Sequence, residues 1–382
     1  MSTGEGRPRI FFATIAAGGG HVAGAHAMAE AIERHYPGRF ELRVSDYMKD
    51  LGIVGLDRLH KDSWRRALRR PVLARAGQRA IDAFPRLTIA VERRILRGFA
   101  RAAAADLEKK PPLLVVSNHG LITTGLAEAR CRHGLRVRVL TFATEVCNIS
   151  AYWAEPRADQ VIAASEDGRR RLIRFGVPAE KITVIGRPVR GAFLNVPSKR
   201  EAREWLGLPD RFTCLVSFGG EGVGRNSRAL VSALLDSGLP LQVVAITGRN
   251  EALRRELRGL RPDTSRLRVE GFVENMADYL AASDVFVGKA GPSSVYEAFA
   301  VGRPVIVTGY AGLNELGVTR LVEEKGLGRY AGSPAALARE VRRYAGEPVL
   351  LDEVELRCRK MDLASVTERF AHHITGYALA RA

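Results

Sequence analysis

The chain has 382 residues, of which 46% are hydrophobic and 26% charged, a composition typical of a soluble globular protein large enough for two domains. No apolar run approaches the roughly 20 residues of a membrane-spanning helix, and the four cysteines form no CxxC pair or other metal-ligand spacing. The formal net charge of +17 indicates an anionic partner, and we expect a cytoplasmic protein with free thiols and no metal.

The first half of the chain alternates apolar runs with helical patterns. Residues 9–16 predict a strand, a glycine-rich loop follows at 17–21, and residues 22–36 predict a helix. Because this alternation gives parallel sheets covered on both faces, it predicts a doubly wound α/β domain. The same pattern predicts further strands and helices at 40–45, 113–117, 121–132, 137–142, 160–164, 165–175 and 181–185.

A basic region, residues 58–110, interrupts this alternation. It carries 15 Lys and Arg against 5 Asp and Glu, with Leu, Ile, Val and Phe recurring among the arginines. This is the pattern of basic amphipathic helices. Two interpretations stay open, a solvated arginine-rich face and a surface that binds an anionic membrane. Nucleic acid is not expected, because the sequence has no zinc finger, RNP-type motif or basic zipper.

Proline and glycine cluster near residues 190–199, which predicts a domain boundary. The strand–helix alternation then restarts. We expect one domain over 1–190, a second over 191–355 and a helical tail over 356–382 that packs back on the first domain. The second domain is expected to hold strands at 212–218, 241–247, 267–269, 285–287 and 305–308, with helices at 227–235 and 251–260.

The stretch GKAGPSSVYEA, residues 288–298, follows a predicted strand and opens a helix at Pro292. Backbone N–H groups and the positive end of a helix attract phosphate at such a turn. Lys289 supplies a cation for a diphosphate, and Glu297, about one turn into the helix, can accept hydrogen bonds from a ribose. The segment therefore predicts a nucleotide-diphosphate site.

Two glycine-rich loops follow predicted strands. The first, AAGGGH, ends at His21, which is placed where a helix begins. A helix N-terminus disfavours the imidazolium, and neutral imidazole can take a proton from a hydroxyl. His21 could instead cap the helix or pack the loop. The second loop, GGEGVG at 219–224, could contact a diphosphate or a sugar, or be only a tight turn.

These motifs together resemble the GT-B-fold glycosyltransferases of the monogalactosyldiacylglycerol synthase and processive diacylglycerol glucosyltransferase type. The stretches VSNHGL, LTFATEVC, GRPVRGAF and GYAGLNELG agree, so the resemblance runs from about Arg9 to Gly328. It implies two Rossmann-like domains facing across a cleft, an acceptor-binding domain over 1–190 and a UDP-sugar-binding domain over 191–355. It also implies an inverting transfer of a hexose from a UDP-sugar to a hydroxyl of a membrane lipid such as diacylglycerol, without cofactor or catalytic metal.

The resemblance implies roles for individual residues. His21 is the expected base, with Glu145 as its partner or its rival. Arg190 is expected near the phosphates at the hinge between the domains. The implied donor-binding residues are Gly220, Gly222, Phe272, Val273, Met276, Lys289, Gly291, Pro292, Ser293, Ser294, Glu297, Asn314, Glu315 and Arg190, and the acceptor-side residues are Gly19, Gly20, His119 and Trp153.

Two departures from the family pattern leave the acceptor and the sugar open. Residues 147–153 lack the histidine of the plant-type pattern, and residues 314–318 read NELGV where that pattern has Gln-Glu-Glu-Gly-Asn. A transferase acting on a soluble or polyprenyl-linked metabolite is therefore the main alternative, followed by a UDP-sugar epimerase and a basic nucleic-acid-binding protein. We expect a peripheral enzyme on the inner face of the cell membrane.

Overall fold

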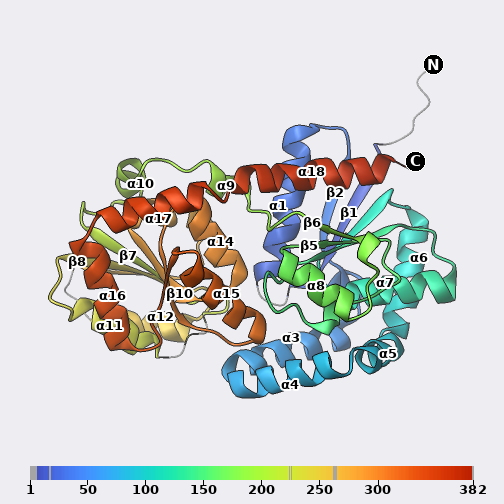
Figure 1. The fold of residues 1–382 in the computed structure, drawn as a ribbon, viewed down its shortest axis with the longest axis horizontal. Coiled ribbons are helices and arrows are strands. Elements are labelled where there is room, and N and C mark those ends of the chain that lie inside the picture. The colour runs from blue at the N-terminus through green and yellow to red at the C-terminus, as the bar shows by residue number, and fades with distance from the viewer. Residues whose placement is uncertain (1–6, 17–18, 223, 225, 261–264, 381–382) are drawn as a thin grey trace. The chain divides into compact units, whose positions relative to one another are not determined.

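The computed structural model describes residues 7–16, 19–222, 224, 226–260 and 265–380 (Figure 1). Ala17, Gly18 and Val223 of the two glycine loops therefore lie outside the described residues. Apart from the excluded positions, the chain divides into two compact units. The first comprises residues 1–190, 312–314 and 364–382, and the second comprises residues 191–311 and 315–363.

A six-stranded sheet forms the centre of the first unit. Its order is β2-β1-β3-β4-β5-β6, and neighbouring strands are parallel. The sheet order turns at β1, which pairs with β2 on one side and β3 on the other. Ligands bind open α/β sheets at the carboxyl ends of strands at such a point. The strands are β1 (Arg9–Thr14), β2 (Glu41–Asp46), β3 (Leu114–Ser117), β4 (Val139–Ala143), β5 (Gln160–Ala163) and β6 (Ile182–Val184).

The C-terminal helix α18 (Leu363–Leu379) packs on the first unit. The Phe370 ring lies 5.0 Å from that of Phe142 on β4, and the Thr367 hydroxyl accepts a hydrogen bond from the Val189 N–H. Figure 1 accordingly draws the red α18 beside the blue α1. The other helical segments outside the basic region are α1 (Gly19–His35), α2 (Tyr47–Asp50), α7 (Gly120–His133), η1 (Ala151–Trp153), α8 (Glu166–Arg174) and η2 (Ala179–Lys181).

The basic region is helical, as predicted. Asp82 of this region accepts a hydrogen bond from Arg171 on α8 at 2.7 Å. Arg93 donates a hydrogen bond to Glu155, which follows η1, at 3.1 Å. Its last helix is buried against α7, where a side chain at Gly125 would meet the Phe99 ring. The four helices are α3 (Val54–Arg69), α4 (Pro71–Ala83), α5 (Pro85–Ile95) and α6 (Arg97–Lys109). Among the described residues, no helix combines the length and apolarity needed to cross a membrane.

The second unit has a six-stranded parallel sheet of order β12-β11-β10-β7-β8-β9. Its order turns between β7 and β10. The strands are β7 (Phe212–Ser217), β8 (Leu241–Ile246), β9 (Leu267–Glu270), β10 (Val285–Lys289), β11 (Val305–Gly309) and β12 (Gly328–Tyr330). The helices are α9 (Gly191–Leu194), α10 (Lys199–Leu206), α11 (Ser227–Leu235), α12 (Glu251–Arg258), α13 (Met276–Ala282), α14 (Pro292–Ala300), α15 (Leu313–Glu324), α16 (Pro334–Gly346) and α17 (Val349–Arg359). The predicted α/β class with two parallel sheets is confirmed.

One helix boundary differs from the prediction in a way that matters for the site. The first helix was expected at residues 22–36, but α1 begins at Gly19. His21 therefore lies in the first helical turn rather than just before it.

Candidate active site

In the first unit, several predicted acceptor-side residues meet at the carboxyl ends of β1, β3 and β4. The His21 ring centroid lies 4.8 Å from that of His119 and 5.8 Å from that of Trp153. His119 and Trp153 are buried, whereas His21 is partly exposed. The structure therefore places three aromatic side chains from separate segments at the turning point of this sheet.

The hydrogen bonds of His21 define its protonation state. Its Nδ1 lies 2.9 Å from the backbone oxygen of Asn118 and 3.1 Å from the Thr144 hydroxyl. Because a carbonyl oxygen can only accept, Nδ1 carries the hydrogen and Nε2 of the neutral ring keeps its lone pair. Burial lowers the pKa of His21 to about 4, the bond to Asn118 opposes this shift, and the charge of Arg187 adds to it. The ring is thus neutral at physiological pH, with an accepting Nε2.

Arg187 is a buried cation beside this histidine that the sequence analysis did not select. Its guanidinium donates to the backbone oxygens of Thr144 and Gly20, which joins the end of β4 to the first turn of α1. Arg190, which was predicted to approach the phosphates, is exposed and pairs with Glu30 on α1 at 2.8 Å. In the first unit, Arg187 rather than Arg190 therefore supplies positive charge near His21.

His119 belongs to a second set of contacts that was also missed. Its Nε2 lies 3.1 Å from Nε2 of His60 on α3, and the Tyr152 hydroxyl lies 2.6 Å from its Nδ1. Burial, together with His21 and His60, holds the pKa of His119 well below its usual range. No spacing in the sequence relates His60 to His119, because they are 59 residues apart on different elements.

Glu145 follows β4, but its contacts differ from those of His21. Its carboxylate accepts from the Ser150 N–H at 2.8 Å, and the Asn314 amide donates to it at 3.3 Å. Burial raises the pKa of Glu145 to about 7. Among the described residues, no hydrogen bond joins Glu145 to His21. Glu145 is therefore a titratable group separate from His21, and it does not orient the histidine.

In the second unit, the glycine loop after β7 has the backbone that the sequence predicts. Gly219 and Gly222 have φ of +73° and +62°, in the left-handed region that favours glycine. A Cβ at Gly222 would lie 2.1 Å from the Thr247 carbonyl oxygen, so no side chain fits there. Gly220 lies between them and accepts from the Arg249 N–H. The loop therefore brings bare backbone to the carboxyl end of β7.

Lys289, at the end of β10, lies between the two loops of the predicted phosphate site. Cβ atoms built at Gly219 and Gly291 would come within 3.8 Å and 3.7 Å of its Cε. Its ammonium donates to Glu315 at 2.8 Å, and the other oxygen of Glu315 accepts from the Ala311 N–H at 2.7 Å. Glu315 is 2% exposed, so it holds Lys289 and does not offer a free carboxylate to a sugar.

The rest of the predicted donor site lies around the start of α14. Gly291 is its N-cap and Pro292 its first residue, so Ser293 and Ser294 lie in the first turn, where amides lack helical acceptors. Glu297 is partly exposed one turn later. Phe272, predicted to frame a base with Val273 and Met276, is 53% exposed, and the Arg249 guanidinium lies 4.4 Å from its ring centroid.

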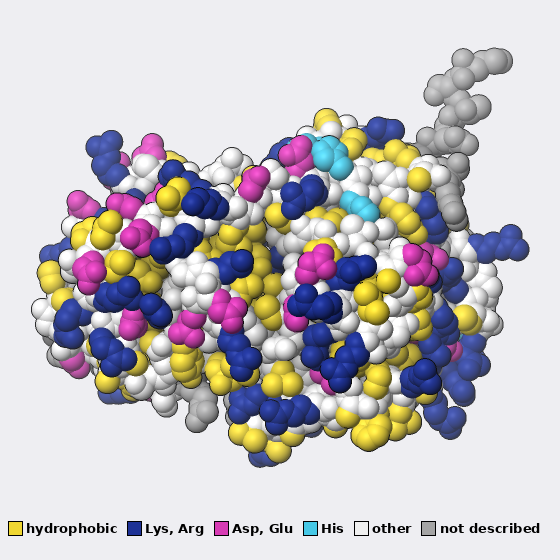
Figure 2. Space-filling view, viewed as in Figure 1, with side chains coloured by type: hydrophobic (Ala, Val, Ile, Leu, Met, Phe, Trp, Pro, Cys, Tyr) yellow, Lys and Arg dark blue, Asp and Glu magenta, His cyan; other side chains and the backbone are white. Residues whose placement is uncertain are grey.

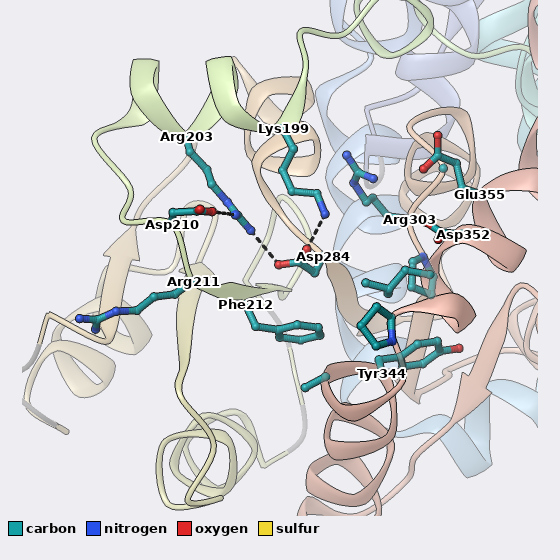
Figure 3. Close-up of a pocket in the computed structure, with 15 residues that line it drawn as sticks. Lys199, Arg203, Asp210, Arg211, Phe212, Asp284, Arg303, Tyr344, Asp352 and Glu355 are labelled. Carbon is teal, nitrogen blue, oxygen red and sulfur yellow. Dashed lines mark hydrogen bonds and ion pairs between the residues drawn. The ribbon is translucent and has the colours of Figure 1, made fainter.

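A cavity of about 390 Å³ in this unit is separate from that site (Figure 3). It lies at the amino ends of β7, β10 and β11. Asp284 accepts from Lys199 at 2.6 Å and from Arg203 at 2.8 Å across it. These ion pairs join α10 to the residue before β10, so the charged groups in the cavity stabilise the fold. The cavity is not the predicted phosphate site.

Comparison with known protein families gives one match in each half of the chain. Residues 34–190 match the family model described as Glycosyltransferase Family 4, and residues 226–346 match that described as Glycosyl transferases group 1. A probable monogalactosyldiacylglycerol synthase of Nicotiana tabacum is 29% identical over 340 residues, which cover 86% of this chain and 63% of that protein. The chain has the GT-B fold and is similar to glycosyltransferases in both units.

Other relatives of this GT-B protein agree. The processive diacylglycerol beta-glucosyltransferase of Staphylococcus saprophyticus is 26% identical over 249 residues, covering 64% of this chain and 62% of that protein. The chain thus spans just under two thirds of the tobacco and staphylococcal relatives. The resemblance to the monogalactosyldiacylglycerol synthase and diacylglycerol glucosyltransferase type is confirmed.

Solved structures support the same fold. Anabaena Alr3699/HepE in complex with UDP matches with a TM-score of 0.59 and 16% identity, covering 96% of this chain and 100% of that one. A putative UDP-N-acetylglucosamine 2-epimerase from Listeria monocytogenes matches with a TM-score of 0.63 and 12% identity, covering 99% and 98%. At these identities the likeness concerns the fold, which transferases and epimerases share.

The neutral state of His21 in this GT-B protein has a measurable consequence. An unfolded histidine binds a proton near pH 6.5, whereas folded His21 does so only near pH 4. Between these values the unfolded state binds more protons, so the free energy of unfolding falls as pH falls. We expect wild type to lose about 1 kcal/mol more than His21→Asn between pH 7 and pH 5, a value reduced for the partial exposure of the ring.

Urea denaturation of both proteins at the two pH values measures this difference. Glu145, whose raised pKa works in the opposite direction, is present in both proteins and cancels in the comparison. Equal losses in the two proteins would show that His21 titrates normally in the folded state.

Proposed function

We propose that this GT-B protein transfers a hexose from a UDP-sugar to a hydroxyl of a membrane lipid such as diacylglycerol, with inversion at the anomeric carbon. The observation that supports this most directly is the neutral His21, which presents an accepting Nε2 at the turning point of the first sheet. The acceptor class is inferred from the names of the sequence relatives, and the donor class from HepE bound to UDP.

The first unit would supply the base. Nε2 of His21 takes the proton of the acceptor hydroxyl while the oxygen forms a bond to the anomeric carbon. The bond from that carbon to the diphosphate oxygen breaks on the opposite face, which inverts the configuration. The nearby Arg187 disfavours the imidazolium, so the proton passes readily to solvent after transfer.

The second unit would bind the donor and stabilise its leaving group. The first turn of α14 and the ammonium of Lys289 would contact the diphosphate, which gains negative charge as the glycosidic bond breaks. Glu297 would accept from the ribose hydroxyls. Because these groups are fixed before the reaction, we propose a reaction without a catalytic metal, and added EDTA should leave the rate unchanged.

The basic helices provide the proposed membrane surface. Among the described residues, fifteen large apolar side chains are exposed, and eight of them lie between residues 54 and 95. Exposed arginines, among them Arg70, Arg79 and Arg86, lie between them. Figure 2 shows yellow and dark-blue side chains mixed over the edge where Figure 1 draws α3 and α4. Such a surface suits a peripheral position on an anionic bilayer, as on the inner face of the cell membrane. The eight residues are Val54, Leu59, Val72, Leu73, Phe84, Leu87, Val91 and Ile95.

Replacing Leu73 and Phe84 together by aspartate should weaken binding to vesicles that contain phosphatidylglycerol by at least about tenfold. Both side chains are more than 60% exposed, so the fold should tolerate the change. Trp205→Asp is the matched control, because Trp205 is 67% exposed in the second unit and should not affect binding. Sedimentation with neutral and anionic vesicles measures the effect, and binding that ignores anionic lipid would contradict the proposed surface.

Product analysis tests the proposed reaction. The full chain is incubated with UDP-galactose, UDP-glucose and UDP-N-acetylglucosamine, each with vesicles containing diacylglycerol. We expect a β-linked glycolipid by mass spectrometry and nuclear magnetic resonance. Transfer only to a soluble or polyprenyl-linked acceptor would show that the proposed diacylglycerol-type acceptor is wrong. Interconversion of the sugar without acceptor would support the epimerase alternative, and salt-sensitive DNA binding without UDP affinity would support a nucleic-acid function.

A further inference from the structure

A histidine–carboxylate cluster joins the end of α1 to α18, both in the first unit. His35 is the last residue of α1, and Glu368 and His372 occupy successive turns of α18. Nδ1 of His35 lies 3.8 Å from Oε1 of Glu368, and Nε2 of His372 lies 3.3 Å from the same oxygen. Figure 2 shows histidine side chains gathered beside acidic ones where Figure 1 draws α1 and α18 together. Neither the predicted donor site nor the predicted acceptor site includes these residues.

The spacing of these atoms matches the requirements of a small divalent metal ion. The three ligand atoms lie within 4.8 Å of one another. In a tetrahedral zinc site, bonds of about 2.0–2.2 Å place neighbouring ligand atoms about 3.3–3.6 Å apart. The Glu368–His372 separation has this value, and small side-chain rotations would bring His35 to it. Two imidazoles and one carboxylate are a ligand set that zinc accepts, with water as a fourth ligand.

A neighbouring tyrosine orients one of the ligands. The Tyr36 hydroxyl lies 2.7 Å from Nδ1 of His372, on the side of the ring away from Glu368. A metal on Nε2 leaves the hydrogen on Nδ1, which then donates to the tyrosine oxygen. An outer hydrogen bond of this kind fixes the tautomer and ring orientation of metal-bound histidines. The cluster therefore has three ligands and an outer partner that aims one of them.

We propose that His35, Glu368 and His372 bind a zinc ion that fastens α18 to α1. Nδ1 of His35, one oxygen of Glu368 and Nε2 of His372 are the protein ligands. The ion neutralises the carboxylate and crosslinks residues more than 330 positions apart in the sequence, so it stabilises the folded first unit. The bound ion is structural and takes no part in sugar transfer.

Zinc titration of the full chain, prepared without a polyhistidine tag, tests the proposal. We expect one zinc per chain by elemental analysis after gel filtration, and a rise of at least about 3 °C in the unfolding temperature at saturation. Magnesium, which prefers oxygen ligands, should have no effect.

Three variants make the test specific. His372→Ala and Glu368→Gln should each weaken zinc binding at least about tenfold and remove the rise in unfolding temperature. His133→Ala, which removes an exposed histidine at the end of α7, should behave like wild type. Tyr36→Phe should weaken binding less than His372→Ala, because it removes only the outer hydrogen bond. Zinc binding that survives in both ligand variants, or no zinc retained by wild type, would overturn the proposal.

Discussion

Replacing His21 by alanine should lower kcat by roughly 10²–10⁴-fold, the usual contribution of a general base. Nδ1 of this ring is held by the Asn118 carbonyl and the Thr144 hydroxyl, so only Nε2 is left to accept a proton. Affinity for the UDP-sugar should change little, because the proposed donor contacts lie in the second unit. Single-turnover assays with radiolabelled UDP-sugar, together with calorimetry of UDP binding, separate these two quantities.

A second histidine on the same helix is the control. His26 is exposed on α1 and makes none of the contacts proposed for catalysis, so His26→Ala should keep the wild-type rate. Glu145→Gln tests the rival base. A wild-type rate in His21→Ala, with a large loss in Glu145→Gln, would transfer the base role to Glu145.

Replacing Lys289 by methionine should weaken UDP-sugar binding by about 10- to 150-fold, which corresponds to the roughly 1.5–3 kcal/mol of a hydrogen bond to a charged group. Lys289 lies within reach of both Gly219 and Gly291, so its ammonium is a side-chain cation close to both loops. The change also leaves Glu315 buried without its ion-pair partner, which should lower the free energy of unfolding by about 1–3 kcal/mol.

The double variant Lys289→Met with Glu315→Gln separates these two effects. Removing the buried charge should restore part of the lost stability, whereas donor affinity should stay low. Lys199→Met is the matched control, because it breaks the ion pair with Asp284 at the other end of the same sheet. It should reduce stability without changing donor affinity. If the double variant regained wild-type affinity, Lys289 would act only by balancing Glu315.

Much of the fold could be predicted because the strands are short apolar runs that end in glycine-rich turns. The helix at Ser227–Leu235 was predicted with its observed bounds, and the other predicted strands and helices differ from the structure by a few residues at their ends. The predicted strand–loop–helix units also locate the turning points of both sheets, because the glycine loops after β1 and β7 follow the strands where the order turns.

Side-chain pairing was less predictable, because it depends on contacts between distant segments. Arg187 and Arg190 lie three residues apart in the stretch GRPVR, and the sequence does not show which of them is buried. In the structure Arg187 is buried beside His21, and Arg190 pairs with Glu30 on the surface. His60 gave no signal, since α3 must first fold over the sheet before it meets His119. Glu315 was interpreted as a sugar ligand because the sequence could not show that Lys289 and an amide occupy both its oxygens.

The return of α18 to the first unit has a consequence for biosynthesis. Phe370 and Phe142 are both fully buried, but a ribosome translates all of residues 191–363 between the main part of that unit and this helix. Part of the apolar face of the amino-terminal sheet therefore stays uncovered until the second unit and α18 have been translated. We expect the partly synthesised chain to need chaperone protection during this interval.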